Sequence, residues 1–188
     1  MGDFGAFFNI GLHHILEGYD HLLFLLGLIL VARSWRSLLM VVSAFTVAHS
    51  TTLVLSALEV LSIPPIITET LIAASIVYVG IENTVRGSGE NSHRWIVAGL
   101  FGLIHGAGFS GQLVGLLKGA VEQGSIWPAL IGFNIGIEVG QIIVVLAALP
   151  LLWLADKQGV REKLVPEISR MIAAVGGVLV VARIWGIG

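Results

Sequence analysis

Six long apolar segments divide this 188-residue chain and constrain its fold more than any other feature. Each is long enough to cross about 30 Å of hydrocarbon as a helix. Only 12% of the residues are charged, about half the share of a soluble domain. The sequence therefore predicts an all-α fold, a polytopic membrane protein built as a bundle of six transmembrane helices in one domain, residues 1–188. The predicted spans are 8–32, 37–59, 64–85, 94–117, 127–154 and 167–186.

The ends of these segments predict an orientation. The five tryptophans fall at predicted span ends, where aromatic residues collect at membrane interfaces. Arginine and lysine concentrate in the first, third and fifth loops, whereas the second and fourth contain only Lys118. The positive-inside rule then predicts both termini outside and, for a bacterial protein, location in the inner membrane. Residues 1–31 lack a basic stretch before the apolar run, so they are not interpreted as a signal peptide.

Composition limits the chemistry that is available. The chain has no cysteine, which excludes disulfides, thiolate nucleophiles and thiolate metal sites. A net charge of −2 without a basic tract argues against a nucleic-acid partner. Imidazole, carboxylate, amide and hydroxyl groups remain, and these ligands suit Ni, Co and Zn.

The stretch Gly11–Phe24 places three histidines, a glutamate and an aspartate inside the first predicted span. A charge at the centre of a bilayer costs about 2.5 to 3.5 kcal/mol on insertion scales, so such residues are functional candidates. In a continuous helix, His14 and His21 would lie on nearly the same face, two turns or about 10.5 Å apart. Asp20 could bind a metal or orient an imidazole.

Other predicted spans carry polar groups at similar depths. His49 lies at the middle of the second span, and His105 lies near the middle of the fourth. In the fifth span, Asn134, Glu138 and Gln141 follow an i, i+4, i+7 spacing and so share one helix face. Because unpaired ionisable groups are costly in hydrocarbon, this pattern predicts a shared intramembrane site of nitrogen and oxygen ligands.

Several polar residues have two readings. The hydroxyls and amides fit two interpretations, as site residues or as hydrogen-bonding contacts between helices. Glu17 is either a ligand or a base. His13 points about 100° away from His14 and is expected to reach the interface. The supporting residues of the predicted site are Glu17, Thr46, Ser50, Glu69, Asn134 and Gln141.

These motifs resemble the HupE/UreJ family of membrane proteins, and the resemblance covers essentially the whole chain. The family's first-helix pattern, His followed by five residues and then Asp-His, is matched by His14, Asp20 and His21, and it is also similar to the signature of nickel/cobalt permeases. Further matching segments are Phe45–Ser50, Gly102–Phe109 and Phe133–Gln141. Two positions depart from the better-known hydrogenase-linked members: Ile15 stands where those have proline, and no second histidine closely follows His105.

The resemblance implies import of nickel or cobalt into bacteria for hydrogenase, urease or cobalamin enzymes. It implies metal binding by the first-helix residues, with counterparts on later helices. The predicted metal ligands are His14, Asp20, His21, His49, His105 and Glu138.

Three functions fit these observations. The first is transport of a divalent transition metal ion, nickel or cobalt, across the bilayer. The second is an intramembrane zinc-dependent hydrolase with Glu17, Glu69 or Glu138 as general base. The third is a structural or sensory subunit whose polar groups only join helices. A cytoplasmic metallochaperone and a homo-oligomer are further partners that the sequence leaves open.

Overall fold

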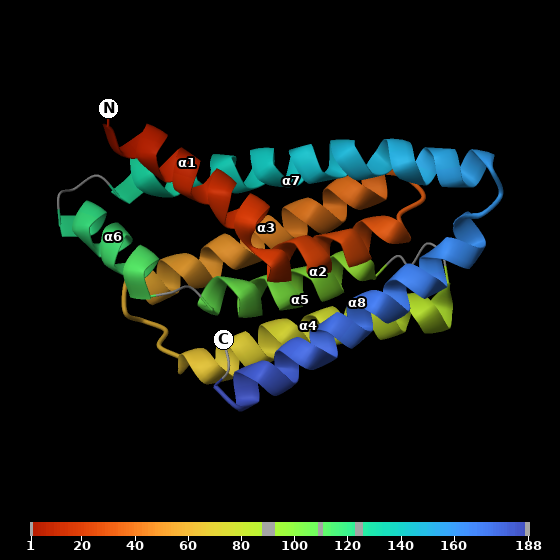
Figure 1. The fold of residues 1–188 in the computed structure, drawn as a ribbon. Coiled ribbons are helices and arrows are strands. Elements are labelled where there is room, and N and C mark those ends of the chain that lie inside the picture. Colours follow the sequence, from red (N-terminus) through yellow and green to blue (C-terminus); the bar gives the residue numbers. More distant parts are fainter. Residues whose placement is uncertain (1, 88–92, 109–110, 123–125, 187–188) are drawn as a thin grey trace.

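A computed structural model describes residues 2–87, 93–108, 111–122 and 126–186, and these form helices without strands (Figure 1). The all-α prediction is confirmed for this part of the chain. The helices are α1 Gly2–Glu17, α2 Tyr19–Leu30, α3 Trp35–Ala57, α4 Pro65–Arg86, α5 Arg94–Ala107, α6 Gly111–Glu122, α7 Ile126–Lys157 and α8 Arg161–Ile184.

The helices associate mainly as three pairs. α1 packs along α7, α3 along α5, and α4 along α8, while α2 contacts several of the others. In Figure 1 the α1–α7 pair and the α4–α8 pair lie on opposite sides of α2, α3 and α5, and α6 lies at one end of the bundle. Lys118 of α6 forms an ion pair with Glu59, just after α3, and this contact lowers the pKa of the Glu59 carboxyl.

Glycines allow the paired helices to approach backbone to backbone. Gly132, Gly136 and Gly140 recur every fourth residue on α7 and face α1. A Cβ atom at Gly136 would collide with the carbonyl oxygen of Phe8, and one at Gly106 of α5 would collide with the His49 carbonyl oxygen of α3. Small residues of this kind form the close helix contacts of membrane bundles.

Two of the six predicted spans are wrong as continuous helices. The span predicted at 8–32 is divided into α1 and α2 at Gly18, and the span predicted at 94–117 is divided because α5 ends at Ala107 and α6 begins at Gly111. Glycine lowers helix propensity by about 1 kcal/mol relative to alanine, so both glycine-rich stretches favour an interruption. Among the described residues, four helices are long and apolar enough to cross a membrane: α3, α4, α7 and α8.

The helix that contains most of the sixth predicted span begins before that span. α8 starts at Arg161 rather than at residue 167, and Pro166 lies inside its second turn. The guanidinium of Arg161 is buried and donates to the carbonyl oxygens of Leu30 and Ala32 at 3.1 and 2.7 Å. It also contacts Asp156 at 2.5 Å. These bonds hold the first turn of α8 against the end of α2.

A second buried arginine closes the same end of the bundle. Arg94, the first residue of α5, donates to the side-chain oxygen of Asn83 at 2.9 Å and to the carbonyl oxygen of Gly27 at 3.4 Å. Asn83 also donates to Gly27 at 2.7 Å. Glu82 lies 3.9 Å from Arg94. We call this group of Gly27, Glu82, Asn83 and Arg94 the Arg94 network. It joins α2, α4 and α5 at the end of the bundle remote from Gly18.

Candidate metal centre

The break at Gly18 brings together two histidines that a straight helix would keep apart. Gly18 has an extended conformation (φ −78°, ψ 92°), yet its N–H donates to the His14 carbonyl and its carbonyl accepts from Leu22. The imidazole centroids of His14 and His21 are only 4.5 Å apart. A continuous helix would place the two residues about 10.5 Å apart along its axis. The predicted continuous helix is wrong here, because α1 ends at Glu17 and α2 begins at Tyr19.

Glycine at position 18 is required by space. A Cβ atom there would lie 2.6 Å from the His14 carbonyl oxygen and 3.0 Å from Nδ1 of His21. Any larger residue would push on the backbone of one histidine and on the ring of the other.

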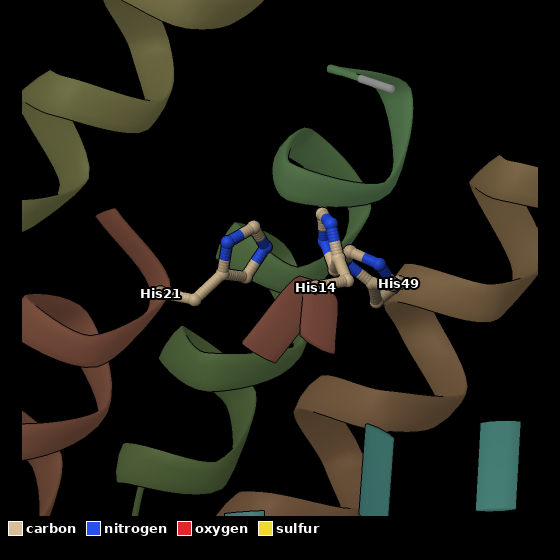
Figure 2. A group of neighbouring side chains, drawn as sticks. All are labelled: His14, His21 and His49. Atoms are coloured by element: carbon tan, nitrogen blue, oxygen red, sulfur yellow. The ribbon is translucent and has the colours of Figure 1, made fainter. Parts of the chain in front are cut away.

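His49 of α3 completes a group of three imidazoles. Its ring centroid lies 5.9 Å from that of His14 and 5.6 Å from that of His21. One ligand atom from each of the three residues lies within 4.8 Å of the others. Figure 2 shows the three side chains converging from three helices. A modest closing movement would let one ion contact all three, since metal–nitrogen bonds are about 2.0 to 2.1 Å long.

His105 of α5 adjoins this group. Its ring centroid is 5.1 Å from that of His21, and its Nδ1 lies 2.9 Å from the Phe101 carbonyl oxygen. Because a carbonyl can only accept, Nδ1 carries the proton and Nε2 keeps its lone pair. The buried Nε2 atoms of His21 and His105 have no hydrogen-bond partner within the described part of the chain. Buried polar atoms normally have partners, so these nitrogens are suited to receiving a cation.

A cleft leads to this histidine cluster. Its volume is about 730 Å³, and three of the four histidines, His14, His21 and His105, line it. Its other described lining residues are Asn9, Ile10, His13, Glu17, Gly18, Tyr19, Asp20, Glu69, Ile72, Gly108, Leu116 and Arg183.

Aromatic rings pack against the histidine cluster and separate it from the Arg94 network. The ring centroid of Phe24 lies 4.9 Å from that of His105, and the centroid of Phe45 lies 5.6 Å from that of His49. Both phenylalanines belong to a buried apolar core that extends along α2, α3, α4 and α5. The histidines thus lie between a polar cleft and an apolar core.

Three of the four carboxylates predicted for the site, Glu17, Asp20 and Glu69, line the cleft and lie outside the three-histidine group. Asp20, in the first turn of α2, is 3.7 Å from a guanidinium nitrogen of Arg183. Glu69 of α4 is 3.3 Å from another nitrogen of the same side chain. Glu17 is exposed, and its carboxylate pairs at 2.8 Å with Nδ1 of His13, which is also exposed as expected.

Four of the predicted supporting residues join α3 to α7. Thr46 donates to the side-chain oxygen of Gln141 at 2.8 Å, and Ser50 donates to the side-chain oxygen of Asn134. Both hydroxyls also contact backbone carbonyls of their own helix. These bonds agree with the interpretation of the four residues as contacts between helices. They hold α3, which carries His49, against α7.

The structure does not bring Glu138 to the cluster. Glu138 is exposed on α7, whereas the neighbouring Gly136 and Gly140 face α1 and Gln141 is buried. At 100° per residue, Glu138 is turned about 60° from Gln141, which is enough to leave it outside both helix contacts.

Sequence reasoning missed Arg183 as a site residue. The signal was present, because Arg183 is an ionisable residue inside the last predicted span, and such residues are functional candidates. The residue type gave no indication of a metal site, because a guanidinium only donates hydrogen bonds and cannot bind a cation.

The family model described as HupE / UreJ protein matches residues 1–187. The curated proteins give no match, and neither do the solved structures.

Proposed function

We propose a function from one premise: the chain belongs to the HupE / UreJ family. Together with its long apolar helices, this membership indicates a membrane protein. The proposed function is transport of a divalent transition metal ion, nickel or cobalt, across that membrane. The observation that carries the proposal is the convergence of His14, His21 and His49 beside a polar cleft.

The chemistry of the ligands supports this choice of ion. Neutral imidazole binds Ni, Co and Zn well, and the chain offers no thiolate that would favour Cu(I). The carboxylates of Asp20 and Glu69 in the cleft would attract a hydrated cation before the imidazoles replace its water. Protonation of an imidazole would release the ion, because only the neutral ring binds a metal.

The interrupted helix supports movement of the ion. Transporters commonly place their substrate at a break in a membrane helix, where two half-helices can shift relative to each other. Here the break at Gly18 lies between two of the proposed ligands, His14 and His21. A change of angle at Gly18 would alter the distance between the two rings and therefore the affinity for the ion.

The proposed orientation follows from charge. Arg94, Arg161 and the other basic residues of the odd-numbered loops would face the cytoplasm, and the cleft would open outward. The proposed location is a bacterial inner membrane with both termini outside.

An intramembrane zinc hydrolase is the second candidate, and the three-imidazole group favours it because catalytic zinc sites often use three protein ligands and a water. Such an enzyme needs a general base near that water. Glu69 is paired with Arg183, Glu17 is paired with His13, and Glu138 does not line the cleft. Transport is therefore the function that we propose.

Uptake by proteoliposomes tests the proposal. We expect the purified protein to accumulate ⁶³Ni or ⁵⁷Co, and His21→Ala to reduce the initial rate at least about tenfold, since a lost second-shell or direct ligand costs that much in metal affinity. The matched control is His93→Ala, an exposed histidine that belongs to neither the cluster nor the cleft lining, which should retain uptake. A protein that accumulates neither metal while retaining one tightly bound zinc would overturn transport and support the hydrolase.

A further inference from the structure

Arg183 places a fixed positive charge in the cleft proposed to admit a cation. It lies in the last turn of α8, and its guanidinium contacts the carboxylates of Asp20 on α2 and Glu69 on α4. All three side chains line the cleft that contains His14, His21 and His105. A positive charge here repels an entering metal cation, so its presence needs an explanation.

Reaching for the membrane surface does not explain the position of Arg183. Arginines near helix ends commonly extend toward the interface with their charge in water. The Arg183 side chain is instead 17% exposed, and it points to two acidic partners on other helices. For comparison, Arg170 of the same helix is 58% exposed and pairs with Glu167 one turn away.

The two carboxylates that hold Arg183 are also the acidic groups best placed to receive a metal ion. Asp20 immediately precedes His21 in the chain, and Glu69 lines the same cleft from α4. A carboxylate engaged with a guanidinium has less capacity for a metal, since both compete for the same oxygen lone pairs. The same oxygens therefore have two alternative cationic partners.

We propose that Arg183 competes with the metal ion for the carboxylates of Asp20 and Glu69. Its guanidinium pairs with both carboxylates while the cleft is empty, and an entering divalent cation displaces it. The single positive charge of Arg183 balances only one of the two carboxylate charges, so that a monovalent cation gains less by entering. A divalent ion carries twice the charge and exchanges the guanidinium for itself. The proposal rests on the proposed function and assigns to Arg183 the control of affinity at that site.

Competition predicts that removal of Arg183 strengthens metal binding. In the full-length protein in lipid nanodiscs, Arg183→Gln should bind Ni²⁺ about three- to tenfold more tightly by isothermal titration calorimetry, the range expected for losing partly exposed ion pairs. Arg183→Lys keeps the charge and should remain within about twofold of the wild type. Arg170→Gln, on the same helix but outside the cleft, is the matched control and should leave affinity unchanged.

A second variant separates competition from simple repulsion between Arg183 and the metal. In a Glu69→Gln background one of the two contested carboxylates is gone, so adding Arg183→Gln should produce a smaller gain in Ni²⁺ affinity than in the wild type. Plain repulsion would give the same gain in both backgrounds. Arg183→Met, which is also uncharged, replaces Arg183→Gln should the latter fail to fold.

The outcomes distinguish this proposal from the function on which it rests. Weaker or unchanged Ni²⁺ binding in Arg183→Gln, or an equal gain in the Glu69→Gln background, overturns the competitor role and leaves metal transport standing. A wild-type protein that neither binds nor accumulates Ni²⁺ or Co²⁺ overturns the transport function itself, whatever the Arg183 variants do.

Discussion

At the scale of single residues, Gly18 combines a close backbone approach with a position between two proposed ligands, His14 and His21. Its missing side chain permits the close approach of the His14 carbonyl and the His21 ring. We expect Gly18→Ala to weaken Ni²⁺ binding at least about tenfold, because the added Cβ must displace the backbone or ring of a proposed ligand, and second-shell disturbances have effects of this size. Isothermal titration calorimetry would measure the loss.

The matched control for that substitution is Gly5→Ala in α1, where a Cβ would meet nothing within 4 Å. It should leave Ni²⁺ affinity unchanged. Equal affinity in Gly18→Ala and the wild type would show that the bend does not set the geometry of the site.

At the scale of helices, the glycine-lined contact between α1 and α7 holds His14 in place. Gly136→Ala would drive a methyl group into the Phe8 carbonyl, and a clash with backbone cannot be relieved by a rotamer change. We expect a loss of about 1 to 3 kcal/mol in the free energy of unfolding, as for other overpacked contacts. Thermal unfolding in detergent would measure it. Gly177→Ala on α8, with open space around the added atom, should unfold like the wild type.

The sequence could not predict where the helices are interrupted. Hydropathy located the apolar segments, and seven-residue spacing correctly suggested that His14 and His21 belong together. It could not show that the chain bends at Gly18, since a glycine within an apolar run is compatible with both a straight and a broken helix. The bend depends on the tertiary contacts of α1 with α7 and of α2 with α4.

Periodicity also gave an incomplete account of α7. Asn134, Glu138 and Gln141 share a face of an ideal helix to within about 60°, yet the first and last contact α3 while Glu138 is exposed. Which edge of a polar stripe meets a neighbour is decided by the packing of the other helices. The ion pairs of Arg183 could not be predicted from periodicity either, because its partners lie on α2 and α4, far away in the chain.

At the scale of the whole molecule, the two ends of the bundle differ. One end has the cleft, which the exposed Tyr19 lines. The other has the buried guanidinium groups of Arg94 and Arg161, which are bonded to carbonyl oxygens of α2 and of the turn that follows it. Between them lies the apolar core that includes Phe24 and Phe45. This asymmetry supports the proposed transport function, with a site that is accessible from one side.

The sidedness of the cleft can be measured directly, because the chain contains no cysteine and each introduced thiol is therefore unique. Tyr19→Cys lies at the cleft, and Gln158→Cys lies in the exposed connection between α7 and α8. We expect a membrane-impermeant maleimide to label Tyr19→Cys from outside the cell and Gln158→Cys only in inside-out vesicles. Labelling of both from the same side would contradict a bundle with opposed ends, and exchanged labelling would invert the proposed orientation. If bound Ni²⁺ closes the cleft, it should also slow labelling of Tyr19→Cys while leaving Gln158→Cys unaffected, which ties the accessible end to the histidine cluster.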